Sequence, residues 1–195
     1  MAIPILLLAS TSPHRRALLD RLGLSFDCHA PGISEQEIPG ETPADRAARL
    51  AVEKARAVAT GHADAIVIGS DQVASLGGPT GATLLHKPGD PDNCRRQLRA
   101  MSGRTVRFDT AVAVIRGDSV LLHADVTMVR LRQLDELAIE SYMEREPSFD
   151  CAGGFKCEGL GVTLFEAIET RDPTALIGLP LIGVCALLRR VGVAV

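Results

Sequence analysis

A short apolar run that leads directly into a helix start constrains the fold of this chain more than any other feature. The residues Leu6-Leu7-Leu8 have the length and character of a buried strand. Ser12 is a favourable N-cap, and Pro13 suits the first position of a helix. The sequence therefore predicts a strand over residues 3–9, a tight turn, and a helix over residues 13–22.

Two arginines, Arg15 and Arg16, fall in the first turn of this predicted helix. The helix dipole is already positive there, so a cation is disfavoured by ~0.3–1 kcal/mol. The free N–H groups of the helix, the hydroxyls of Ser10 and Ser12 and the two guanidinium groups together would form a cradle for a phosphate. The alternative is an ordinary amphipathic helix with solvated arginines.

The remaining pattern alternates between strands and helices. Strand patterns cover residues 65–74, 105–115 and 120–130, and residues 116–119 between the last two are typical of a hairpin turn. Helical patterns cover residues 43–60, 90–101, 134–144 and 180–191. The last of these is apolar around most of its circumference, so we expect it to be buried. Interleaved helices and strands with one antiparallel pair predict a mixed-sheet α/β fold.

Composition excludes several functional classes. The net charge of −3 gives no overall basic field that would attract nucleic acid or acidic lipid. Aromatic residues make up 3% of the chain, too few for stacking platforms that bind single-stranded nucleic acid. No apolar run is long enough to span a bilayer, and the first residues lack the basic region of a signal peptide. We therefore expect a cytoplasmic protein with no nucleic-acid polymer or membrane as partner.

The cysteines give no sign of a metal site or of disulfides. Their number is odd, and no C-x-x-C pairs are present. We expect reduced, mostly buried thiols, as is usual in the cytosol. The five residues are Cys28, Cys94, Cys151, Cys157 and Cys185.

Two charged residues stand in apolar surroundings. Asp71 follows a buried strand pattern, where α/β folds often place binding groups. It could bind a metal, act as a general base, or cap a turn at the end of the strand. Lys54 lies at the edge of the apolar face of the helix predicted over residues 43–60. It either extends to solvent or reaches an internal anion, because a buried ammonium needs a partner.

Two glycine-rich segments carry further candidates. Lys87 follows the loop at residues 77–89 and either presents its amine to a phosphate or lies in a surface turn. The segment at residues 151–161 carries Lys156 and Glu158 on a flexible backbone. It would suit a lip over a ligand, or it connects two elements.

Glu35 and Glu37 lie in a polar segment. Near Asp71 they would suit Mg²⁺, and alone they would form a solvated acidic loop. The chain has no P-loop, no G-x-G-x-x-G after a strand, no H-E-x-x-H and no G-x-S-x-G. The remaining serines, arginines, lysines and carboxylates fit metal-assisted phosphoanhydride chemistry better than acyl transfer.

Six motifs in order along nearly the whole chain resemble those of the Maf family of nucleoside triphosphate pyrophosphatases. They are Ala9-Ser-Thr-Ser-Pro-His-Arg-Arg16, Glu53-Lys-Ala55, Gly69-Ser-Asp-Gln72, Lys87-Pro88, Ala152-Gly-Gly-Phe-Lys-Cys-Glu-Gly159, and Arg171-Asp-Pro-Thr174 with Gly178-Leu-Pro180. The resemblance implies a single domain over residues 1–195 with a two-lobed, inosine-triphosphatase-like α/β fold and a central cleft. It also implies hydrolysis between the α- and β-phosphates to a nucleoside monophosphate and pyrophosphate, with Mg²⁺, Mn²⁺ or Co²⁺ as cofactor.

The resemblance implies a role for each residue that matches a family motif. Catalysis would depend on Asp71, Lys54, Glu35 and Lys87, with Asp71 as the proton acceptor and Glu35 and Asp71 as metal ligands. The residues that hold the phosphates would be Ser10, Ser12, Arg15, Arg16, Lys54 and Lys87. Ser34 stands where an acidic residue commonly precedes the position of Glu35, a departure that weakens the expected metal site.

The motifs also distinguish branches of the family. Ser-Thr-Ser-Pro, Asp71-Gln72 and Phe155-Lys-x-Glu158 are similar to the branch that hydrolyses 7-methyl-GTP. This similarity implies that His14, Gln72 and Glu158 bind the base. The dTTP/UTP branch carries Arg, Thr and Gln at those three positions. The 7-methyl-GTP branch usually has Trp where His14 stands, so we expect weaker base stacking here.

Two alternative functions stay open. A regulator of cell division that binds nucleotides without turnover would keep Ser12, Arg15 and Arg16 but would not need Asp71. A house-cleaning pyrophosphatase for other nucleotides, such as dTTP or UTP, would keep the catalytic residues and differ in base recognition. The expected partner is a nucleoside triphosphate, and the oligomeric state stays open, with a homodimer as one option.

Overall fold

The computed structural model describes residues 5–78 and 81–195. The strands are β1 (Leu6–Leu8), β2 (Asp27–Cys28), β3 (Ile66–Leu76), β4 (Thr83–Leu85), β5 (Thr105–Arg116), β6 (Ser119–Leu131) and β7 (Phe165–Glu169). The α-helices are α1 (Pro13–Asp20), α2 (Pro43–Ala59), α3 (Pro91–Met101), α4 (Glu136–Arg145) and α5 (Leu181–Arg190). Short 3₁₀ helices lie at Ala152–Gly154, Leu160–Leu164 and Ala175–Ile177.

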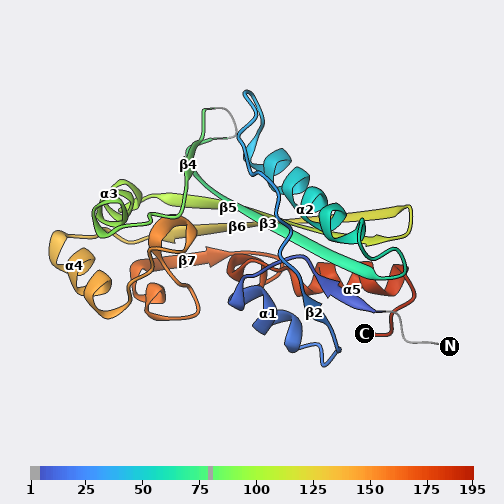
Figure 1. The fold of residues 1–195 in the computed structure, drawn as a ribbon. Helices are drawn as coiled ribbons and strands as arrows, with labels where there is room; N and C mark the ends of the chain where they lie inside the picture. The colour runs from blue at the N-terminus through green and yellow to red at the C-terminus, as the bar shows by residue number, and fades with distance from the viewer. Residues whose placement is uncertain (1–4, 79–80) are drawn as a thin grey trace. The chain divides into compact units, whose positions relative to one another are not determined.

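The strands form a mixed sheet in the order β2-β1-β3-β5-β6-β7, with β4 paired to β3 outside this path (Figure 1). Strand β1 is parallel to β2 and β3, whereas β3–β4 and β6–β7 are antiparallel pairs. The structure thus confirms the predicted mixed-sheet α/β fold. It also confirms each predicted strand and helix to within a few residues, although Ile3 and Pro4 of the first predicted strand lie outside the described residues.

Helix starts could be predicted from the sequence because most of them are capped by side chains nearby in the chain. The side chains of Ser12, Thr42, Asp90 and Asp135 each accept a hydrogen bond from the backbone N–H three residues further on. Such a cap satisfies one of the N–H groups left unpaired at a helix start and typically stabilises the helix by ~1 kcal/mol. The strands β2, β4 and β7 were not predicted, because strands this short show little periodicity.

The chain divides into two compact units. Unit 1 comprises Met1–Gln72, Thr110–Asp125 and Asp172–Val195, and unit 2 comprises Val73–Asp109 and Val126–Arg171. Helices α1, α2 and α5 belong to unit 1, and helices α3 and α4 belong to unit 2.

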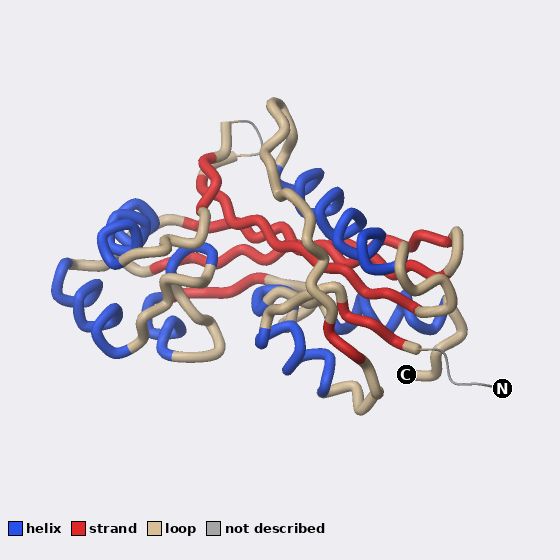
Figure 2. The backbone as a smooth tube through the Cα atoms, in the orientation of Figure 1, coloured by secondary structure: helices blue, strands red, loops and turns tan. Residues whose placement is uncertain are grey.

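Unit 1 has helices on both faces of its strands (Figure 2). Alternate strand residues point to opposite faces, so Leu6, Leu8, Ile66 and Ile68 pack together in one core with residues of α1 and α5. Helix α2 covers the other face through apolar residues that include Ala47, Leu50, Ala51 and Ala55. Burying each such leucine or isoleucine contributes ~1.5–3 kcal/mol, which makes this layered core the main source of stability in unit 1.

The expectation that the last helix is buried holds for one of its faces only. Leu181, Val184, Leu187 and Leu188 of α5 are buried, but Ile182 on the same helix is 61% exposed. Helix α5 therefore packs with one face only.

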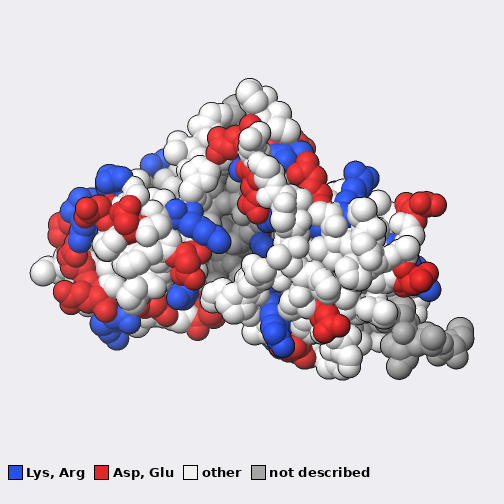
Figure 3. Space-filling model, viewed as in Figure 1, with Lys and Arg blue, Asp and Glu red and all other residues white. Residues whose placement is uncertain are grey.

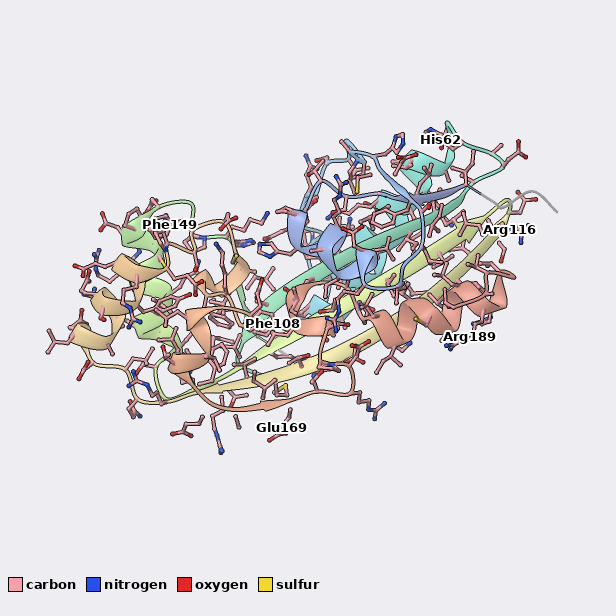
Figure 4. All side chains as sticks on the ribbon, turned by 90° about the horizontal axis from the view of Figure 1, so that it is seen from below. His62, Phe108, Arg116, Phe149, Glu169 and Arg189 are labelled. Carbon is pink, nitrogen blue, oxygen red and sulfur yellow. The ribbon has the colours of Figure 1, made fainter. Side chains whose placement is uncertain are left out.

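Unit 2 is built around an aromatic cluster and a pair of helices. Phe155 lies edge-to-face against Phe108 and Phe165, with ring centroids 5.7 and 4.9 Å apart, and Figure 4 shows Phe108 on β5. Helices α3 and α4 are joined by the ion pairs Arg95–Glu140 and Arg99–Glu136. Acidic and basic side chains are interspersed over this part of unit 2 (Figure 3). Exposed ion pairs of this kind contribute little each, ~0–1 kcal/mol, so the apolar cluster dominates.

All five cysteines are free thiols, as predicted. The expectation that most of them are buried is wrong: Cys94 is buried, Cys28 is exposed, and the other three are intermediate. Among the helices of residues 5–78 and 81–195, none is both long enough and apolar enough to cross a membrane.

Candidate functional site

Two carboxylates meet one buried lysine in unit 1. Lys54 Nζ lies 2.5 Å from Asp71 Oδ1 and 2.7 Å from Glu35 Oε1. Lys54 and Asp71 are each 6% exposed, while Glu35 is exposed. A buried ammonium is stable only with a partner of opposite charge. Of the two alternatives for Lys54, the structure therefore shows the second, in which the side chain reaches an internal anion.

Packing of α2 against β3 brings these groups together. Asp71 lies within β3, inside the strand predicted over residues 65–74, so the alternative in which it caps a turn at the end of the strand is wrong. Gly69, two residues earlier on the same face, lets the helix come close: a Cβ there would lie 2.4 Å from the Ala51 carbonyl oxygen. Lys54 follows Ala51 by about one helical turn, so the close approach places its side chain opposite Asp71.

The surroundings of Asp71 change its ionisation. Burial raises the pKa of the Asp71 carboxyl, and the nearby charge of Glu35 raises it further. The charges of Lys54 and Arg15 and the Lys54 hydrogen bond oppose this increase in pKa. For Arg15, burial lowers the pKa, while Asp71 and Glu35 raise it. The result is a buried carboxyl with a raised pKa beside two cations, an arrangement suited to accepting a proton.

The residues of the predicted phosphate cradle lie on the turn before α1 and in its first turn. Ser12 Oγ accepts a hydrogen bond from the Arg15 backbone N–H at 3.4 Å, and Ser10 Oγ accepts one from the Ser12 N–H at 3.1 Å. Each hydroxyl can still donate to an anion. Arg16 is exposed, and His14 on the same turn is half-buried.

Arg15 takes a different direction from Arg16. Its Nε donates to the Gly178 carbonyl oxygen at 2.9 Å, and the side chain interacts electrostatically with Asp71 and Glu35. The structure therefore brings the start of α1 and the Lys54 cluster into one region of unit 1.

Gln72 has contacts that the sequence did not predict. Its Nε2 donates to the carbonyl oxygens of Ala175 and Leu176 at 2.9 and 3.0 Å, and it lies 3.1 Å from Thr110 Oγ1. The amide donors of Gln72 are thus used inside unit 1, and a contact with a base stays a prediction for this residue. Ala175 and Leu176 directly follow the Arg171-Asp-Pro-Thr174 motif, which was noted in the sequence without a role.

The remaining predicted residues, Lys87 and Glu158, lie in unit 2 and are exposed. The loop that carries Glu158 is held by the end of α4. Glu146 Oε2 accepts a hydrogen bond from the Gly161 N–H, and the Tyr142 hydroxyl accepts one from the Lys156 N–H, both at 3.2 Å. The roles of Lys87 and Glu158 stay predictions. Glu146 and Tyr142 were not found from sequence, because their importance arises from the folded loop.

Comparisons with known proteins agree with the motifs. A family model described as Maf-like protein matches residues 5–191. The 7-methyl-GTP pyrophosphatase of Xanthomonas axonopodis pv. citri is 55% identical over 190 residues, which cover 97% of this chain and 98% of that protein. The 7-methyl-GTP pyrophosphatase of Polaromonas sp. is 50% identical over 191 residues, 97% of this chain and 85% of that protein.

Among solved structures, the Staphylococcus aureus Ham1 protein is similar with a TM-score of 0.45 and 15% identity over 65% of this chain and 71% of that one. The family match covers almost the whole sequence, and the relatives align over nearly its full length. The chain therefore belongs to the Maf family.

Proposed function

We propose that this protein hydrolyses the α–β phosphoanhydride of 7-methyl-GTP to the nucleoside monophosphate and pyrophosphate. Relatives that are 45–55% identical over nearly the whole chain carry the name 7-methyl-GTP pyrophosphatase. The observation that carries the proposal is the contact of the buried Lys54 with the buried Asp71 and the exposed Glu35, beside the start of α1. A protein that only binds nucleotides has no need of a buried carboxylate with a raised pKa, so this contact favours an enzyme over a regulator.

Asp71 is the proton acceptor in this proposal. A water molecule attacks the α-phosphorus, a new P–O bond forms, and the bond from the α-phosphorus to the bridging oxygen breaks. The proton of the water passes to the Asp71 carboxylate, and pyrophosphate leaves. A raised pKa brings a carboxylate closer to the operating pH, which favours proton transfer.

The cations around Asp71 would neutralise charge on the triphosphate. Stabilising the charge of the transferred group is the usual main source of catalysis in phosphoryl transfer. Lys54 and Arg15 lie beside Asp71, and Ser10, Ser12 and Arg16 lie on the turn that precedes or starts α1. Lys87 is assigned to the phosphates from the family pattern alone.

The residues present also fit a divalent cation. Asp71 and Glu35 direct carboxylate oxygens to the same ammonium group, and oxygen is the donor that Mg²⁺ and Mn²⁺ prefer. We propose that these two carboxylates hold Mg²⁺, Mn²⁺ or Co²⁺ together with phosphate oxygens. The cation would supply additional positive charge against the triphosphate.

Base recognition is assigned to Glu158 and His14. 7-Methylguanine carries a delocalised positive charge that guanine lacks, so a carboxylate beside the ring attracts the methylated base. His14 offers less stacking area than the tryptophan that is usual at this position. Since nucleotides are cytoplasmic metabolites, we expect the enzyme to act in that compartment.

The reaction is tested by product analysis in ¹⁸O-labelled water. Incubation of 7-methyl-GTP with the enzyme and Mg²⁺ is expected to release pyrophosphate and to place ¹⁸O in the nucleoside monophosphate. Label in the pyrophosphate would place the attack at the β-phosphorus. Nucleotide binding without turnover would support the regulator.

A further inference from the structure

Three consecutive residues of β3 point to two different faces of the strand. Asp71 faces α2 and contacts Lys54, whereas Ser70 and Gln72 face the side on which the segment 172–180 lies. Ser70 Oγ lies 2.7 Å from the Ala111 carbonyl oxygen and 3.0 Å from the Gly178 carbonyl oxygen. Side chains of successive strand residues point to opposite faces. Asp71 therefore points to Lys54 on one face of β3, while Ser70 and Gln72 contact the segment 172–180 on the other.

The segment 172–180 is fixed at its start as well. Asp172 Oδ1 accepts hydrogen bonds from the N–H and the hydroxyl of Thr174, and its Oδ2 accepts one from the Ile182 N–H at 2.7 Å. The Leu181 N–H donates to Thr174 Oγ1 at 2.8 Å. Asp172 and Thr174 are buried. These contacts cap the start of α5 and leave the segment little freedom to move.

Gly178 connects this segment to Arg15. Its carbonyl oxygen accepts from Arg15 Nε at 2.9 Å and shares the single proton of the Ser70 hydroxyl with the Ala111 carbonyl oxygen. Gly178 has a φ of +118°, which side-chain-bearing residues rarely adopt, and a Cβ there would lie 3.5 Å from Arg15 Nε. The backbone at this position is therefore shaped to receive the guanidinium group.

We infer that Ser70 is a positioning residue that orients Arg15 through the Gly178 carbonyl. The inference rests on the proposed function, in which Arg15 binds phosphate. A guanidinium group binds phosphate through a planar fork of donors, so its direction matters as well as its charge. The hydrogen bond at Nε fixes the plane of the group, and Ser70 holds the acceptor in place.

A double-mutant cycle tests the coupling. We expect Ser70→Ala to raise KM for 7-methyl-GTP about threefold to tenfold, the effect of losing one hydrogen bond. In an Arg15→Ala background, the same substitution is expected to change KM less than twofold, because the guanidinium group that Ser70 orients is no longer present. An equal effect of Ser70→Ala in both backgrounds would overturn the inference.

Ser75→Ala is the matched control. Ser75 is also on β3 and 1% exposed, but its Oγ has no hydrogen-bond partner within residues 5–78 and 81–195. Its loss is expected to leave KM and kcat unchanged. If Ser70→Ala does not fold, Ser70→Cys replaces it, because a thiol of similar size is a weak donor and should shift KM in the same direction.

A second readout needs no catalysis. In NMR spectra, hydrogen exchange of the Arg15 Nε–H is expected to be slow in the wild type and in Ser75→Ala, and at least severalfold faster in Ser70→Ala. Unchanged exchange in Ser70→Ala would contradict the positioning role. If the wild type hydrolyses no nucleotide, the proposed function fails, and this exchange measurement still decides the role of Ser70.

Discussion

In the proposed reaction, Asp71 is the proton acceptor. It lies inside a strand, 6% exposed, with a lysine ammonium 2.5 Å away. Burial raises the pKa of the carboxyl, and Lys54 and Arg15 limit that increase. A carboxylate in such a position is suited to accepting a proton.

Replacing Asp71 by asparagine removes the base and keeps the volume. We expect turnover of 7-methyl-GTP by Asp71→Asn to fall ~10²–10⁴-fold, the usual contribution of a positioned base. Asp118→Asn, in the exposed turn between β5 and β6, is the control and should retain wild-type turnover. Steady-state rates and circular dichroism of both variants check this. A folded Asp71→Asn protein with turnover within a few-fold of the wild type would show that Asp71 is not the base.

The pH dependence follows from the same contacts. The base must be ionised, so kcat/KM should rise with pH through the pKa of Asp71. Burial raises that pKa, so the acidic limb should lie above the value of ~3.9 for an ordinary aspartate. Lys54→Met removes a charge that lowers the pKa, so it should move the limb to higher pH. pH–rate profiles of both proteins test this, and a limb that moves down or stays in place would contradict it.

At the scale of elements, α2 and β3 are held close by a glycine. A Cβ at Gly69 would lie 2.4 Å from the Ala51 carbonyl oxygen and 2.6 Å from the Ala55 nitrogen. We expect Gly69→Ala to lower the free energy of unfolding by ~1–3 kcal/mol, because the helix must move away from the strand. Turnover should fall as well, since Lys54 would be displaced from Asp71.

The control for this substitution is Gly61→Ala, where a Cβ would meet only the Val58 carbonyl oxygen at 3.9 Å. Its stability should stay within about 0.5 kcal/mol of the wild type, as is usual for uncrowded surface positions. Urea denaturation of the three proteins measures the difference. Equal free energies of unfolding for Gly69→Ala and Gly61→Ala would show that α2 can move away from β3 without destabilising the protein.

Elements with their own sequence signals were predictable. Helices that begin at a Ser12 or Thr42 cap show where they start, because capping is local. Helix α5 was also predicted, from Pro180 and its apolar residues, but its cap could not be: it is Asp172, ten residues before the Ile182 N–H. The partner of Lys54 could not be predicted either, because it depends on how α2 packs on β3. The role of Ser70 depends in the same way on a segment more than a hundred residues away in the chain.

At the scale of the whole molecule, the proposed function requires a chain of net charge −3 to bind a substrate whose triphosphate carries about four negative charges. Local cations and a divalent metal would make this favourable. We expect activity to be lost in excess EDTA and restored by Mg²⁺ or Mn²⁺. Glu35→Gln should raise the Mg²⁺ concentration needed for half-maximal rate, whereas Glu53→Gln, elsewhere on unit 1, should not. Full turnover in EDTA would refute the metal-assisted reaction.

The choice of nucleotide tests the central claim most directly. We would measure kcat/KM for 7-methyl-GTP, GTP, UTP, dTTP and CTP by pyrophosphate release, with the wild type and with Glu158→Gln. The wild type is predicted to have its highest kcat/KM with 7-methyl-GTP. In Glu158→Gln the ratio of kcat/KM for 7-methyl-GTP to that for GTP is predicted to fall, because the carboxylate no longer attracts the charged base. A wild-type preference for UTP or dTTP would contradict the assigned substrate.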